Sequence, residues 1–385
     1  MESVPGAAEL ALFKIELWLR MVWPRPALPW VEVPVIDLSD DELEVQGAPD
    51  KSEPQVSAKR RTSVPAMFKP QKAQRTLSPG PCPVPKCFGT AVFLEPNADF
   101  LWHLREYGYA VLQGVLGEDC GRFQDEFWSA MASVVPRLDP SRVETWTFPK
   151  GFRGIVTSYG LPHADFAWMV RAHPRMRQAF AHIFGTEDLV VSLDAVIAQA
   201  GASTTKLPQW LHKDQHPKHA GLSVQAVYTH YGSGPLEAGT CVVPFSHKTT
   251  YPWELAAKGD FIRAPEDFES EANAVKPDVP PDSAIFFNSR LVHASRGPLS
   301  TPSLARPARP ARPARVGVCV AYAPCSRRSE ATRRKKEMAY LQGKCSSHWP
   351  CDRFSLKPPM KSFQVLQGAA TLPPPPRLEE RLRLL

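Results

Sequence analysis

The stretch Trp-Leu-His-Lys-Asp-Gln-His-Pro, residues 210–217, and the stretch Phe-Phe-Asn-Ser-Arg-Leu-Val-His, residues 286–293, decide the fold and the chemistry expected of this chain. In an extended strand, residues i and i+2 point to the same face, so His212 and Asp214 present an imidazole and a carboxylate side by side. His293 is the candidate for a third ligand. Two histidines and one carboxylate on one face of a metal leave the opposite positions open, which suits non-haem Fe(II).

The surroundings of these residues make the pattern more specific. A histidine and an aspartate one residue apart recur by chance, and a histidine is more often structural than a metal ligand. Here residues 236–248 contain an apolar strand and a Pro-Phe-Ser-His turn, and residues 281–287 form a second apolar strand directly before the distal stretch. The order of these segments resembles the phytanoyl-CoA dioxygenase family, over roughly residues 91–355.

The resemblance implies both a fold and an activity. The fold is α+β, with a double-stranded β-helix (jelly roll) core, flanking N-terminal helices and disordered Pro-rich extensions. The activity is that of an oxidoreductase that uses Fe(II), 2-oxoglutarate and O2 to hydroxylate a substrate, with release of succinate and CO2. His212, Asp214 and His293 are then the metal ligands and catalytic residues. The substrate is not identified, and we expect a small-molecule or lipid-like compound.

The cosubstrate imposes a further requirement. The distal carboxylate of 2-oxoglutarate needs a cation, best an arginine, which pairs with a carboxylate through two hydrogen bonds. The resemblance places this arginine at the head of the strand after the distal histidine, which is Arg315, with Ser295 assisting. It also matches Tyr228 and Gln225 to positions that line the cosubstrate pocket. For these last two residues, an ordinary place in the wall of the sheet is the alternative.

An Ala-Arg-Pro repeat separates the distal histidine from Arg315, within a predicted loop insertion at residues 299–314. The repeat offers Arg306, Arg309 and Arg312 as rival anchors. We prefer Arg315 because it adjoins a β-prone run, whereas an arginine beside proline does not fit a central strand.

Proline usage predicts how the chain is divided. The chain has 41 prolines in 385 residues, roughly twice the average usage of about 5%. We expect an N-terminal arm at residues 1–90 with one short helix, a jelly-roll domain at residues 91–355 and a Pro-rich tail at residues 356–385. The arm and the tail are too polar and Pro-rich to bury a core.

Apolar periodicity predicts helices before strands. Residues 101–112 form a helix running into a strand, and helices follow at residues 117–134 and 166–184. Residues 189–199 form a buried strand containing Asp194, an acid that needs a partner and for which a structural role is favoured over a place in the site. Further β-prone runs are at residues 222–231, 240–244, 283–287 and 316–322.

One short motif in the arm indicates a protein partner. Val33, Val35, Ile36 and Leu38 precede a run of acids and resemble motifs that bind small ubiquitin-like modifiers, in which a strand adds to the edge of the partner's sheet. A plain acidic linker is the better-supported alternative, because short motifs often match by chance.

Charge and cysteine usage exclude several classes of protein. The net charge is +7, but the excess lies in loop and tail clusters, so nucleic acid is not an expected partner. Eight cysteines lack a disulfide-framework spacing. No stretch reaches the ~18 apolar residues of a membrane span. We therefore expect an intracellular protein, in the cytoplasm or nucleus.

Two other functions remain as alternatives. One is a catalytically silent jelly-roll scaffold recruited through the arm, against which the intact triad argues. An oxygenase acting on nucleic acid or protein is the other. Nucleic-acid demethylases of the superfamily carry an Arg-x-Asn-x5-Arg signature after the distal histidine, which the stretch Arg315-Val316-Gly317 lacks.

Overall fold

The computed structural model describes most of the chain beyond the predicted arm. The described residues are 91–149, 153–200, 210–234, 237–272, 274–297, 312–357 and 368–385. The chain divides into two parts, Met1–Thr76 and Leu77–Leu385, and every described residue lies in the second. The arm, its predicted helix and its motif for ubiquitin-like modifiers therefore lie outside the described residues, as does the repeat up to residue 311.

The described chain opens with the predicted helix that runs into a strand. After β1 (Val92–Phe93), α2 (Ala98–Tyr107) begins at Asn97, whose side chain accepts two backbone N–H groups of the first turn. Gly108 ends the helix with φ at 86°, a conformation that costs glycine little, and β2 (Tyr109–Gln113) follows at once.

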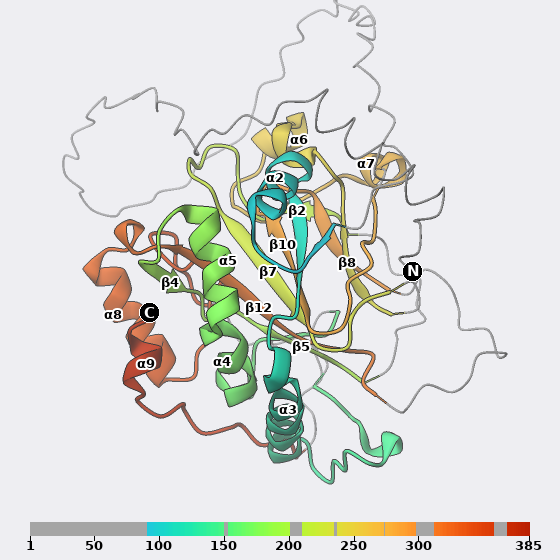
Figure 1. Cartoon of the computed structure of the whole chain (residues 1–385), viewed down its shortest axis with the longest axis vertical. Helices are drawn as coiled ribbons and strands as arrows, with labels where there is room; N and C mark the ends of the chain where they lie inside the picture. The colour runs from blue at the N-terminus through green and yellow to red at the C-terminus, as the bar shows by residue number, and fades with distance from the viewer. Residues whose placement is uncertain are drawn as a thin grey trace, which may run out of the picture. The chain divides into compact units, whose positions relative to one another are not determined.

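Three helices that follow β2 in the chain cover one face of the larger sheet (Figure 1). α3 (Cys120–Val134) buries the predicted apolar stripe. The single helical pattern predicted at residues 166–184 is two helices, α4 (Asp165–Ala172) and α5 (Pro174–Phe184). The break falls at Pro174, which has no N–H to continue the first helix and a φ suited to starting the second.

The strands form two sheets. One has eight strands in the order β1-β2-β10-β7-β12-β5-β3, with β4 paired to β12, and the other has four in the order β8-β11-β6-β9. The remaining strands are β3 (Ile155–Val156), β4 (Leu189–Val191), β5 (Val196–Gln199), β6 (His212–Lys213), β7 (Val224–Thr229), β8 (Gly239–Val242), β9 (Ile262–Arg263), β10 (Ser283–Asn288), β11 (His293–Arg296) and β12 (Arg315–Pro324). The other helices are α6 (Pro252–Leu255), α7 (Glu266–Glu271), α8 (Glu330–Leu341) and α9 (Glu379–Leu382), with 3-10 turns at η1 (Gly117–Asp119), η2 (Val143–Thr145), η3 (Leu161–His163), η4 (Ser246–Lys248) and η5 (Cys325–Arg327).

The two faces of the larger sheet bury different clusters. On β7, Ala226 and Tyr228 belong to the main core shared with the helices, whereas Val227 belongs to a second cluster. That second cluster contains Val242 of β8, so it lies where the larger sheet meets the smaller one. Because side chains alternate along a strand, Gln225 shares the face of Val227. The larger sheet therefore has a helix-covered face and a face toward the smaller sheet.

The predicted buried strand at residues 189–199 is two strands, β4 and β5, with Asp194 between them. The carboxylate of Asp194 accepts from the backbone of Ala195 at 2.6 Å and pairs with Lys357, whose Nζ is 2.6 Å away. The structural role favoured for this acid from the sequence agrees with these contacts.

The C-terminal part of the chain packs more than its composition predicts. Leu384 and Leu385 are buried in the main core, and the backbone of Val191 donates to the carbonyl of Leu384 at 2.8 Å. The expectation of an unpacked tail is therefore not met by residues 368–385. It failed because a few terminal leucines suffice to anchor a proline-rich segment.

The described chain is thus a mixed helix and sheet fold with two sheets, in agreement with the predicted α+β class. None of its described helices is long and apolar enough to cross a membrane.

Candidate active site

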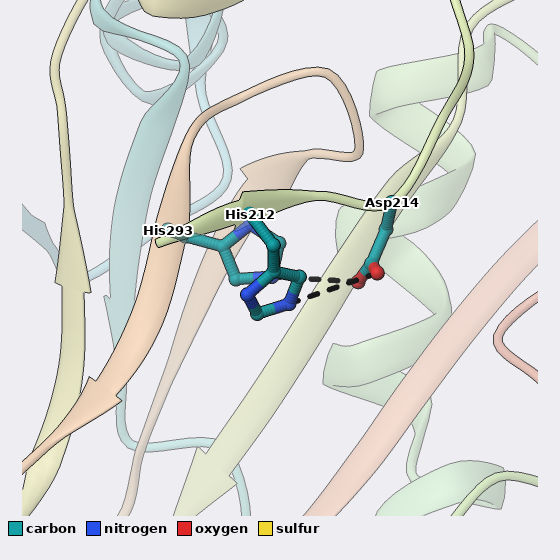
Figure 2. A group of neighbouring side chains, drawn as sticks. All are labelled: His212, Asp214 and His293. Carbon is teal, nitrogen blue, oxygen red and sulfur yellow. Dashed lines mark ion pairs between the residues drawn. The ribbon is translucent and has the colours of Figure 1, made fainter. Parts of the chain in front are cut away.

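The structure brings the three predicted metal ligands together. β11 pairs with β6 so that His293 lies opposite His212, and Asp214 follows directly after β6. Their ligand atoms all lie within 4.8 Å of one another. Figure 2 shows both imidazole rings directed toward the carboxylate, with His212 Nε2 3.7 Å from Oδ1 and His293 Nε2 3.4 Å from Oδ2.

Backbone carbonyls fix which nitrogen of each histidine is available. His212 Nδ1 lies 3.1 Å from the carbonyl oxygen of Trp210, and His293 Nδ1 lies 2.9 Å from that of Leu291. A carbonyl only accepts, so Nδ1 carries the proton in both rings and Nε2 offers a lone pair. Burial, assisted by the neighbouring His293, lowers the pKa of His212 to about 4. His212 is therefore neutral at physiological pH, as a metal ligand must be.

The carboxylate of Asp214 is ionised. Burial alone would raise the pKa of Asp214, but His212 and His293 outweigh it and hold that pKa well below its ordinary value. The site thus offers two imidazole nitrogens and one carboxylate oxygen. This is the ligand set typical of non-haem Fe(II).

Aromatic rings surround the two histidines. The ring centroids of Trp210 and Phe261 lie 4.5 and 4.9 Å from that of His212. The ring centroid of Phe287 on β10 lies 4.4 Å from that of His293. Trp210 adopts φ at 57°, which is strained for a bulky side chain, and such outliers concentrate at functional sites.

Arg315 is a buried cation with hydroxyl partners. It heads β12, is 3% exposed, and donates from NH1 to Ser295 Oγ at 3.1 Å and from NH2 to Thr240 Oγ1 at 3.4 Å. Its Nε has no hydrogen-bond partner, and in the described part of the chain no carboxylate forms an ion pair with it. A buried guanidinium without an anion is costly, so this place fits an anionic ligand.

The rival arginines differ from Arg315. Arg312 is engaged elsewhere, because it pairs with Glu237 at 3.0 Å and donates to the carbonyl of Tyr231 at 2.8 Å. The predicted insertion thus makes specific contacts at its end. Arg306 and Arg309 lie outside the described residues.

Comparison with known proteins agrees with this geometry. The sequence profile of phytanoyl-CoA dioxygenase matches residues 104–306, more than half of the 385-residue chain. The chain belongs to the phytanoyl-CoA dioxygenase family. The resemblance predicted from the sequence is confirmed.

The relative and the solved structures that follow are each 30% or less identical to this member of the phytanoyl-CoA dioxygenase family. The Ava biosynthesis cluster protein O of Aspergillus versicolor is 30% identical over 180 residues, which is 41% of this chain and 58% of that protein. The chain therefore spans less than two thirds of that relative. Among solved structures, the epimerase SnoN in complex with Fe3+, α-ketoglutarate and nogalamycin RO is 18% identical (58% of this chain, 82% of that one, TM-score 0.40). EctD from S. alaskensis with 2-oxoglutarate and 5-hydroxyectoine is 17% identical (61% and 79%, TM-score 0.41).

Gln225 and Tyr228, which the resemblance assigns to the cosubstrate pocket, lie on opposite faces of β7. Gln225 faces the metal centre, where its Nε2 donates to Asp214 Oδ2 at 3.0 Å. Tyr228 lies three residues along β7, on the helix-covered face, and its hydroxyl donates to Asp282 Oδ1 at 3.2 Å. Strand alternation thus directs Tyr228 away from the triad, which agrees with the alternative of an ordinary wall residue.

Two residues near the family site were missed in the sequence. Thr240 lies on β8 opposite Ser295 of β11 and shares Arg315 with it. Arg153 donates from NH1 to the carbonyl of Ser295 at 2.6 Å, and its guanidinium lies 5.6 Å from the Trp210 ring centroid. The β-prone run indicated the strand of Thr240 but not its register, and no local pattern marks Arg153.

Proposed function

We propose that this chain is an Fe(II)- and 2-oxoglutarate-dependent dioxygenase that hydroxylates a small-molecule or lipid-like substrate. One observation carries the proposal. His212, His293 and Asp214 come together on strands that also carry, through Ser295, a buried Arg315 with no carboxylate partner among the described residues. The first set suits the metal, and the second suits the distal carboxylate of the cosubstrate.

The triad residues fit the metal because of their donor atoms and because the two imidazole rings are already oriented. Carbonyls of Trp210 and Leu291 hold both Nδ1 protons, so the histidines present Nε2 without rearranging. A bound iron would supply the oxidation of 2-oxoglutarate and substrate by O2, giving succinate, CO2 and a hydroxylated product. The aromatic rings of Trp210, Phe261 and Phe287 would limit the access of water.

The cosubstrate would lie between the metal and Arg315. Ser295 stands two residues beyond His293 on β11, so both side chains point to the same face of that strand. Ser295 and Thr240 hold the guanidinium of Arg315 in place and leave Nε for a ligand. The anchor would thus be set before the ligand arrives, which lowers the entropic cost of binding.

We also infer that the two sheets form the double-stranded β-helix expected from the sequence. In support, successive strands β5, β6, β7 and β8 alternate between the larger and the smaller sheet, and so do β10, β11 and β12. Such a roll holds ligands on facing strands, as β6, β11 and β12 hold the proposed site.

Succinate formation by protein purified without oxygen tests the proposed function. Protein loaded with Fe(II) should convert 2-oxoglutarate to succinate slowly on its own and faster with a true substrate. Asp214→Ala should abolish both rates, because it removes the charged ligand. Succinate release that is equal in the parent and in Asp214→Ala would refute the assignment and favour a silent scaffold.

A further inference from the structure

We propose that Gln225 is a positioning residue of the metal centre, whose side-chain amide holds the Asp214 carboxylate toward the two histidines. This role differs from the cosubstrate contact expected of Gln225 from the sequence. It rests on the proposed function, since it concerns the same metal site.

The hydrogen bonds of Gln225 fix its orientation. Nε2 donates to Asp214 Oδ2 at 3.0 Å and to Ser289 Oγ at 3.2 Å. An amide nitrogen has two hydrogens, so one serves each bond. A carboxylate only accepts, so the nitrogen of Gln225, and not its oxygen, must face Asp214.

Ser289 in turn anchors this amide. It is fully buried in the turn between β10 and β11, and its Oγ lies 2.8 Å from Ser223 Oγ. Its backbone donates to the carbonyl of Ser223 at 2.9 Å and accepts from the N–H of Asp214 at 2.9 Å. The same turn therefore holds the backbone of Asp214 directly and its side chain through Gln225.

This arrangement connects the two ligand-bearing segments. Asp214 follows β6, whereas Ser289 precedes His293 by four residues on the chain. In the described part of the chain, Gln225 is the side chain outside the triad that hydrogen-bonds the Asp214 carboxylate. Without it the carboxylate can rotate away from the histidines. Loss of a hydrogen bond that orients a metal ligand typically costs roughly 10–100-fold in metal affinity.

Gln225→Met tests the proposal, because methionine matches the length of glutamine and has no N–H. Titration with Mn(II) without oxygen should show an affinity roughly 10–100-fold weaker than that of the parent. The visible absorption of the Co(II)-loaded protein should also change, since it reports the ligand geometry. The melting temperature of the metal-free protein should stay close to that of the parent.

Gln199→Met is the matched control, because Gln199 lies on β5 of the same sheet and its Oε1 has no hydrogen-bond partner among the described residues. It should bind Mn(II) as the parent does. Ser289→Ala, which keeps Gln225 but removes its anchor, should lose affinity in the same direction by a smaller factor. This variant decides the matter if Gln225→Met does not fold.

Parental Mn(II) affinity and an unchanged Co(II) spectrum in Gln225→Met, or in Ser289→Ala where only that variant folds, would overturn the positioning role. Equal losses in Gln199→Met would overturn it as well, because the effect would then be general. A parent that binds no Mn(II) would instead overturn the proposed function. The two failures are thus distinguishable.

Discussion

At the residue scale, the site depends on single side chains whose charge states are set by burial and by neighbours. His212 and His293 hold the pKa of Asp214 well below its ordinary value, and burial lowers the pKa of His212 to about 4. Three donors of this kind bind a divalent metal jointly. When one donor is removed, the remaining two ligands should bind the metal too weakly to retain it.

Replacement of His212 or Asp214 by alanine should abolish Fe(II) and Mn(II) binding. Each side chain supplies one of three ligand atoms that lie within 4.8 Å of one another. Calorimetric titration of Mn(II) into the metal-free variants provides the measurement, with His219→Ala as a control outside the triad. Undiminished affinity in both triad variants would remove the metal from this place.

Arg315→Ala should weaken 2-oxoglutarate binding by about 2–5 kcal/mol, the usual loss when one partner of a buried hydrogen-bonded charge pair is truncated. Arg312→Ala should have little effect, because Arg312 already pairs with Glu237. Binding of 2-oxoglutarate to the Mn(II)-loaded proteins compares the two. Equal losses would mean that the anchor of the cosubstrate lies elsewhere.

Sequence patterns located the triad because its geometry follows from strand periodicity and from the order of apolar segments. Strand alternation alone shows that Gln225 and Tyr228, three residues apart, point to opposite faces. Which of them faces the triad depends on how β7 packs between the helices and the smaller sheet. The turn at Phe245 is a similar case. Phe245 of the Pro-Phe-Ser-His turn adopts φ at 67°, which is strained for a bulky side chain, and the sequence does not disclose this strain.

At the scale of elements, a buried ion pair fixes the strand that carries the first two ligands. Lys213 lies between His212 and Asp214, and its Nζ is 2.6 Å from Oε1 of Glu254 on α6. The two side chains are 1% and 2% exposed. Lys213 also donates to the carbonyl of Thr249 at 2.8 Å. The pair thus ties β6 to α6 directly beside the metal centre.

Lys213→Met should destabilise the protein by about 3–5 kcal/mol, because it leaves the carboxylate of Glu254 buried without its partner. Urea unfolding of the metal-free proteins measures the loss. Lys248→Met is the matched control, since Lys248 pairs with Glu106 at the same 2.6 Å distance but the two side chains are 43% and 41% exposed. It should cost less than about 1 kcal/mol. Similar losses of unfolding free energy in the two variants would contradict the claim that burial makes the Lys213–Glu254 pair the more important one.

At the scale of the whole molecule, the described core is built from residues beyond the first of the two parts. Its main cluster joins the helix-covered face of the larger sheet to Leu384 and Leu385 near the end of the chain. The sequence predicts from its composition that the arm adds little to this core, because a polar, Pro-rich segment cannot offset the entropy of ordering. It did not predict the packing of Leu384 and Leu385, which have no periodic pattern around them.

Deletion of Met1–Thr76 should leave metal binding and thermal stability close to those of the full chain. The boundary is the one that separates the two parts of the chain. Calorimetric titration and thermal melting compare the two proteins. A lower melting temperature or a lost metal site would show that the arm contributes to the core.

The central claim is that the triad and Arg315 together form a metal and 2-oxoglutarate site, and titration of 2-oxoglutarate into oxygen-free protein tests it most directly. Mn(II)-loaded parent should bind 2-oxoglutarate, metal-free parent should bind it far more weakly, and Asp214→Ala should bind it no better than the metal-free parent under either condition. Binding that is independent of the metal, or absent from the Mn(II)-loaded parent, would contradict the claim.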